Sequence, residues 1–162
     1  MYIPFDQLSD EARIWVYQAN RHLEDEKIKE ILQRAHDFLA QWTSHGRPLQ
    51  CSAESFYNQF LVLAVEESFQ GTTGCAVDAS IQFIRDLEQI FCVDFLSKTH
   101  ITFRKNEKNF LVPLSQLQAH IQKGTVSDST FVFDNTITKK KELACKWLMR
   151  ADASWLGKYF HD

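Results

Sequence analysis

Six consecutive apolar residues at positions 60–65 constrain the fold of this chain more than any other feature of its sequence. The run has the length of a β-strand and falls far short of the roughly 20 apolar residues that cross a bilayer. Both faces of such a strand are apolar, so both have to be covered to keep them from water. The sequence therefore predicts a central strand over about 56–66.

Two long amphipathic helices are predicted, one before this strand and one after it. In the first helix, which Gly46 and Pro48 end, apolar residues recur at three- and four-residue spacing. Its apolar stripe consists of Ile28, Ile31, Leu32, Ala35, Phe38, Leu39 and Trp42. The second helix extends from about Cys75 to about Phe91, and its stripe consists of Val77, Ile81, Ile84, Leu87 and Phe91. A strand at 12–19, rich in β-branched and aromatic residues, precedes the first helix.

The remainder of the chain has shorter elements and more polar turns. The predicted elements are a hairpin of 101–103 and 110–112, a short helix from Ser115 to Gly124, a strand at 130–133 and a helix at 139–149. In that last helix Leu143, Trp147 and Leu148 are expected to point inward. The complete order is β-α-β-α followed by β-β-α-β-α.

This order predicts an α+β (mixed α/β) fold, in which a mixed sheet is covered by the two long helices. A chain of 162 residues is long enough for one ordinary domain or two small ones. We expect an α/β subdomain at 1–97 and a hairpin-helix-strand subdomain at 98–162, packed on the first. A single domain is the alternative.

Charge and cysteine spacing exclude several classes of function. A formal net charge of −3 gives no reason to expect a nucleic acid or an anionic membrane as partner, and the basic run 139–141 is interpreted as a solvated helix start. The first ten residues lack the basic segment of an export signal. The four cysteines and six histidines show no spacing typical of a metal site. We expect a cytoplasmic protein with reduced thiols, no metal and no cofactor.

The C-terminal part has a recognisable arrangement of motifs. A hairpin leads into Val-Pro-Leu-Ser-Gln-Leu-Gln-Ala-His-Ile-Gln-Lys-Gly at 112–124, and Val-Ser-Asp-Ser-Thr-Phe-Val-Phe at 126–133 and then Trp147 follow. This arrangement resembles the GYF-like modules of bacterial proteins, although 139–146 looks inserted and Arg-Ala at 150–151 replaces a Pro-Ala pair. The resemblance implies a partner-binding or packing module rather than an enzyme. A plain hairpin-helix-strand unit without shared function is the alternative.

Short motifs along the whole chain carry a second resemblance. They are Met-Tyr-Ile-Pro-Phe from Met1, Arg-Ile-Trp-Val-Tyr-Gln-Ala from Arg13, Glu-Glu-Ser-Phe from Glu66, Gly-Cys-Ala-Val-Asp from Gly74 and Ser-Trp-Leu from Ser154. The chain is similar in these motifs to uncharacterised bacterial proteins that are sometimes catalogued as ABC transporter ATPases. Such an ATPase needs a Gly-x-x-x-x-Gly-Lys-Ser/Thr loop to wrap the phosphates, and none of the five glycines begins one. We therefore do not expect ATP hydrolysis by a Walker mechanism.

The loop between the central strand and the second helix is the candidate site. Ligands of open α/β sheets bind beyond strand ends, and the free N–H groups of a helix start favour an anion. The candidates for anion or ligand binding are Thr72, Thr73, Gly74, Cys75 and Asp78, with Asp78 in the first turn. A helix start also stabilises a thiolate, so the catalytic candidates are Cys75, Glu66, Glu67 and His45. The alternative is a structural turn that Thr73 caps.

The aromatic C-terminal segment has to pack on the protein or contact another chain. The candidate partner-binding residues are Trp147, Trp155, Tyr159 and Phe160, and core packing is the alternative. Our first hypothesis is a non-enzymatic cytoplasmic binding or interaction protein, with a protein partner or self-association through these residues. The second is a small enzyme or ligand-binding protein centred on 66–78. It requires a pocket lined by Glu66 or Glu67, Cys75 and a histidine.

Overall fold

The computed structural model describes residues 1–67 and 71–160, which form two compact units. The first unit comprises residues 1–96 together with 138–141, and the second comprises 97–137 and the chain from 142 onward. Helices and antiparallel strands occur in both units, which confirms the predicted α+β class. None of the helices in the described part of the chain is long and apolar enough to cross a membrane.

A three-stranded antiparallel sheet forms the centre of the first unit, in the order β1-β5-β4. Its strands are β1 (Arg13–Gln18), β5 (Phe60–Val65) and β4 (Cys51–Phe56), and both outer strands run antiparallel to β5. Every residue of β5 is buried, so the apolar run is the central strand that the sequence predicts. The sheet is antiparallel where a mixed sheet was expected, because β4 and β5 form a hairpin.

The hairpin corrects the predicted boundaries of the central strand. The strand expected at 56–66 begins only at Phe60, because the chain turns at Tyr57 and Asn58, which both have positive φ angles (56° and 52°). The residues before the turn form β4, which no pattern predicted. Polar and small residues dominate β4, so it lacks the β-branched and aromatic signature of a strand.

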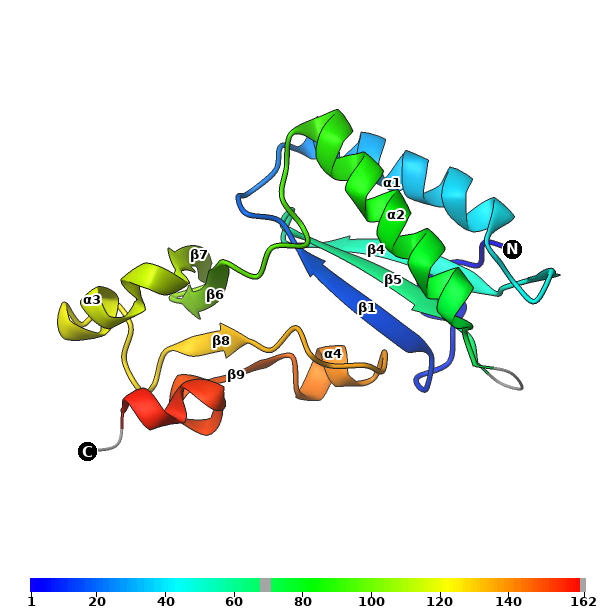
Figure 1. Ribbon diagram of the computed structural model, residues 1–162. Coiled ribbons are helices and arrows are strands. Elements are labelled where there is room, and N and C mark those ends of the chain that lie inside the picture. The colour runs from blue at the N-terminus through cyan, green and yellow to red at the C-terminus, as the bar shows by residue number, and fades with distance from the viewer. Residues whose placement is uncertain (68–70, 161–162) are drawn as a thin grey trace. The chain divides into compact units, whose positions relative to one another are not determined.

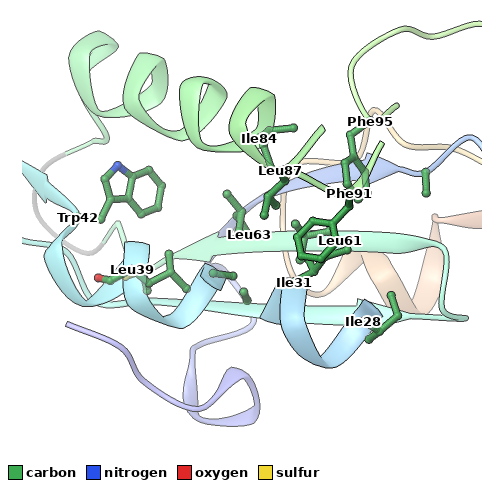
Figure 2. Packing of buried hydrophobic residues seen from close by; sticks show 14 of the residues in the cluster. Ile28, Ile31, Leu39, Trp42, Leu61, Leu63, Ile84, Leu87, Phe91 and Phe95 are labelled. Carbon is green, nitrogen blue, oxygen red and sulfur yellow. The ribbon is translucent and has the colours of Figure 1, made fainter. Parts of the chain in front are cut away.

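Helices α1 (Asp25–Gln41) and α2 (Gly74–Phe91) lie on one face of this sheet (Figure 1). Both helices were predicted, and the predicted stripe of α1 packs with Leu61 and Leu63 of β5 in a single core cluster. Helix α2 joins this cluster through Ala76, Ile84, Leu87 and Phe91, whereas Val77 and Ile81 of its predicted stripe are only half-buried. Figure 2 shows Trp42 at one end of this cluster and Phe91 with Phe95 at the other. The ends of α1 and α2 near Trp42 are therefore fixed by the core beneath them.

A two-residue turn follows α1 and connects the short strands β2 (Thr43–Ser44) and β3 (Arg47–Pro48). His45 and Gly46 form this turn with φ angles of 53° and 74°, as a tight β-hairpin turn requires. Gly46 meets the second positive φ at no steric cost. The hairpin holds His45 at the C-terminal end of α1.

The second unit contains a four-stranded antiparallel sheet in the order β7-β6-β8-β9. The predicted hairpin is confirmed as β6 (His100–Lys105) and β7 (Lys108–Pro113), and the predicted strand near 130 as β8 (Phe131–Phe133). Helical turn η2 (Leu114–Gln116) and helix α3 (Leu117–Gln122) follow β7. The core of this unit consists of Ile101, Phe103, Val112, Leu117, Val126, Val132 and Leu156.

The helix predicted at 139–149 is wrong. Only α4 (Glu142–Cys145) is helical there, and it leads into the strand β9 (Leu148–Arg150) and the helical turns η3 (Ala151–Ala153) and η4 (Trp155–Tyr159). Residues 138–141 run along the edge of β1 in the first unit, with an antiparallel bridge between Lys139 and Arg13 and a turn at 140–141. Ile14 N donates to Thr138 O and Lys140 N donates to Ala12 O, each over 2.9 Å. The basic run therefore begins with a bridge to β1 and continues as a turn rather than as the start of a helix.

Candidate functional site

A cavity of about 660 Å³ opens in the first unit where α1 ends, the β2–β3 hairpin turns and α2 begins. Helix α1 contributes Asp37, Phe38 and Gln41, which lie on one side of the helix because they are spaced by one and four positions, and its C-cap residue Trp42 follows. The hairpin directly follows α1, whereas α2 begins only at Gly74, and the core cluster shared by α1 and α2 brings them together.

Two aromatic residues, Phe38 and Trp42, line the cavity and are called its aromatic base here, and Phe83 and Trp15 pack against them without lining it. The ring of Phe38 stacks on Phe83 with centroids 4.6 Å apart and planes 3° apart, and lies 5.4 Å from the ring of Trp42. Trp42 is only 3% exposed, and its Nε1 donates to Ala76 O over 2.9 Å. Trp15 meets the same indole edge-on at 6.1 Å. The base is therefore rigid, since packing or hydrogen bonding holds each ring.

The first turn of α2 forms the polar side of the cavity. Thr73 is the N-cap, and its Oγ1 accepts from Ala76 N over 3.2 Å. Ser44 of the hairpin donates from its Oγ to Thr73 Oγ1 over 3.2 Å and accepts from Thr73 N over 3.3 Å. The candidate cap is thus confirmed as a cap, and the hairpin holds it in place.

Two backbone N–H groups at this helix start remain available. In the part of the chain that the structure describes, the amides of Gly74 and Cys75 donate no hydrogen bond. The first turn of α2 contains no acidic residue, because the helix begins at Gly74 and Asp78 lies beyond that turn. Asp78 was expected in the first turn, and it does not line the cavity.

The cavity brings together Cys75 and His45, which are distant in sequence. Both residues are exposed and both line the cavity, together with Thr73, Ala76 and Ala79. No hydrogen bond between the thiol and the imidazole is present among the described residues. The described residues also contain no group of three His, Cys, Asp or Glu side chains arranged to hold a metal ion.

The other residues proposed for this loop serve different purposes. Glu66 accepts from Ser9 N (2.8 Å) and Ser9 Oγ (2.7 Å), while Glu67 accepts from Thr72 N (3.0 Å) and Thr72 Oγ1 (2.8 Å). Glu66, Glu67 and Thr72 are absent from the cavity lining. The pocket expected from the sequence thus contains its cysteine and its histidine but neither glutamate. Residues 68–70 of the predicted loop lie outside the described residues.

The four aromatic residues proposed to bind a partner lie in different environments of the second unit. Trp147 is 3% exposed, stands edge-on to Phe133 with centroids 4.9 Å apart, and donates from Nε1 to Asn135 Oδ1 over 2.9 Å. Tyr159 and Phe160 are half-buried against the core of that unit. Trp155 is 52% exposed, so of the four it alone presents most of its side chain to solvent.

Several cavity residues were missed by sequence reasoning. Phe38 and Trp42 were assigned to the apolar stripe of α1, and Asp37 and Gln41 have the polar character of any exposed helix face. The sequence does show a helix end, a Gly-containing turn and a glycine-flanked helix start as separate features. Sequence spacing does not show that these elements meet.

No protein-family profile, curated protein or solved structure matches this chain.

Proposed function

We propose that this chain is a non-enzymatic, cytoplasmic binding protein whose ligand is a small molecule held in the cavity beside the start of α2. The observation that carries the proposal is the cavity itself, with its volume of about 660 Å³, aromatic base and polar rim. Ligand pockets in proteins typically have about 300–1,000 Å³ and combine apolar walls with a few convergent polar groups.

Binding fits the side chains better than catalysis does. A cysteine nucleophile needs a base within hydrogen-bond reach. Cys75 and His45 share the cavity without such a bond between them among the described residues. The carboxylates of Glu66 and Glu67 accept hydrogen bonds from Ser9 and Thr72 instead of facing the cavity. Polar groups around an aromatic base suit recognition without a reacting pair.

A binding experiment with a cavity-filling variant tests the proposal. The probe is 8-anilinonaphthalene-1-sulfonate, whose aromatic body and anionic head match the base and rim. Ala79→Trp fills the cavity from an exposed position on α2, and Gln89→Trp places the same side chain on an exposed position near the other end of α2. We expect Ala79→Trp to weaken probe binding by about tenfold or more and Gln89→Trp to leave it unchanged.

The cysteines provide a second readout in the same samples. Cys75 lines the cavity, whereas Cys92 and Cys145 are exposed elsewhere. Bound probe should slow alkylation of Cys75 and leave the rates at Cys92 and Cys145 unchanged. Equal probe affinity in the two tryptophan variants, with no protection of Cys75, would rule out the cavity as the binding site.

A further inference from the structure

Building on the proposed function, we propose that the ligand is a zwitterion: a small molecule with an aromatic or other apolar body, a carboxylate and an ammonium group. The carboxylate contacts the start of α2 and the ammonium contacts the end of α1. The cavity volume, two helix ends of opposite polarity, one acidic side chain and the aromatic base together lead to this ligand class.

Opposite ends of two helices line the same cavity. Gln41 and Trp42 mark the C-terminal end of α1, where the helix dipole is negative, and Thr73 and Cys75 mark the N-terminal end of α2, where it is positive. The last turn of α1 has no basic residue and the first turn of α2 has no acidic one. Neither helix end is therefore neutralised by its own side chains.

Hydrogen-bond donors stand at the positive end. The amides of Gly74 and Cys75 have no acceptor among the described residues, whereas Thr73 satisfies the amides of Ala76 and Val77. Of these two residues Cys75 lines the cavity and Gly74 does not, so the N–H of Cys75 is the donor that we assign to the ligand carboxylate. The exposed imidazole of His45 lines the same cavity.

A carboxylate stands on the α1 side of the cavity. Asp37 accepts a hydrogen bond from Gln33 Nε2 over 3.2 Å, and no ion pair of the described residues includes it. A ligand carrying only negative charge can use the free N–H at the start of α2 but leaves Asp37 without a partner, and a ligand carrying only positive charge leaves that N–H unsatisfied. A zwitterion satisfies both sides, and its apolar body covers Phe38 and Trp42.

Three probes that differ by one charged group separate these cases. L-phenylalanine carries both groups, 3-phenylpropionate lacks the ammonium and phenethylamine lacks the carboxylate. Each is titrated against the protein that holds 8-anilinonaphthalene-1-sulfonate, and the displacing concentration is measured. We expect L-phenylalanine to displace the fluorophore at a concentration about tenfold or more below either analogue, since each charge-assisted hydrogen bond lost weakens binding by about that factor.

A matched pair of variants assigns the ammonium to Asp37. Asp37→Asn removes the charge at the cavity, and Asp86→Asn removes an exposed charge elsewhere that accepts from Gln82 in the same i, i+4 arrangement as Asp37 accepts from Gln33. We expect Asp37→Asn to weaken L-phenylalanine binding about tenfold, with 3-phenylpropionate binding no more weakly than before, and Asp86→Asn to change neither. The assigned amide resonance of Cys75 should shift with both carboxylate probes and not with phenethylamine.

The outcomes separate this inference from the proposed function. If either analogue displaces the fluorophore as well as L-phenylalanine does, or if Asp37→Asn changes nothing, the zwitterion is wrong while the cavity remains a binding site. If the fluorophore binds Ala79→Trp and Gln89→Trp equally, the proposed function itself fails.

Discussion

At the scale of single residues, the carboxylate of Glu11 has the most strongly shifted pKa in the first unit. Lys139 and Lys141 both donate to it, and these hydrogen bonds lower its pKa from 4.5 to about 2. Both lysines belong to the segment that lies along β1, so the charge pairs help hold that segment in place. The contact is exposed, and salt therefore screens it.

Acid should remove this contribution to stability. The folded-state pKa of Glu11 is lowered, so its contribution is complete above about pH 4.5 and is lost as the pH falls toward 2. We expect Glu11→Gln to be less stable than the parent near neutral pH, and the difference in unfolding free energy to vanish across this interval. Urea unfolding at low salt measures it.

Glu30→Gln is the control for this experiment. Glu30 is exposed on α1 and forms no ion pair among the described residues. Its substitution should leave the pH dependence of unfolding unchanged. A difference between Glu11→Gln and the parent that stays constant from pH 6 to pH 2 would contradict the assignment.

At the scale of elements, the first turn of α2 provides the polar side of the cavity. Thr73 caps the helix, and Ser44 holds Thr73 from the hairpin. Loss of the cap would release the first turn, which supplies the two free amides. The cap therefore has both a structural and a binding consequence.

Substitutions of Thr73 test the cap directly. Thr73→Ala removes the oxygen that accepts from Ala76 N, and we expect unfolding to become easier by about 1 kcal/mol. Thr73→Ser keeps that oxygen and should remain within a few tenths of a kcal/mol of the parent. Urea unfolding followed by circular dichroism measures both variants. Equal stability of the alanine and serine variants would show that the cap contributes nothing.

The sequence predicted an element correctly where regular apolar spacing continued over many residues. It failed where contacts with residues distant in sequence decided the structure. Helices α1 and α2 and the hairpin β6–β7 follow from apolar spacing. Strand β4 was missed because pairing with β5, and not its own composition, makes it a strand. The helix expected at 139–149 failed because Glu11 and the edge of β1, distant in sequence, provide partners for a non-helical backbone at 139–141.

The candidate site was predictable only in part for the same reason. Thr73, Gly74 and Cys75 are adjacent in sequence, so a helix start with free amides could be predicted from them. Trp42 had the spacing of a core residue, and it is indeed buried, but its exposed neighbours on α1 line the cavity. Which helix ends meet is decided by packing over the whole first unit, which local patterns do not encode.

Each of the two units, at the scale of the whole molecule, is built from more than one stretch of chain. The chain enters the second unit at residue 97, returns to the first for 138–141, and then completes the second. Residues 138–141 cover part of the outer edge of β1, and an uncovered edge strand invites pairing with other chains. The returning segment therefore protects the sheet of the first unit.

A proline in the segment 138–141 of the full chain tests whether this segment protects the edge of β1. Lys140→Pro removes the N–H that donates to Ala12 O, whereas Lys140→Ala removes only the side chain, whose Nζ donates to Leu8 O. We expect the Ile14 amide, which donates to Thr138 O, to exchange with deuterium at least about tenfold faster in the proline variant than in the alanine variant. Equal exchange at Ile14 would show that the segment does not protect the edge.

The return of the chain at 138–141 also has a consequence for synthesis on the ribosome. The first unit cannot be completed when residue 96 emerges, because its last segment is still to be translated. At ordinary elongation rates this postpones the final edge contact by roughly 2–9 s. During that interval the edge of β1 in the nascent sheet is not yet covered. Chaperones should therefore bind most to nascent chains whose last translated residue lies between 96 and 141.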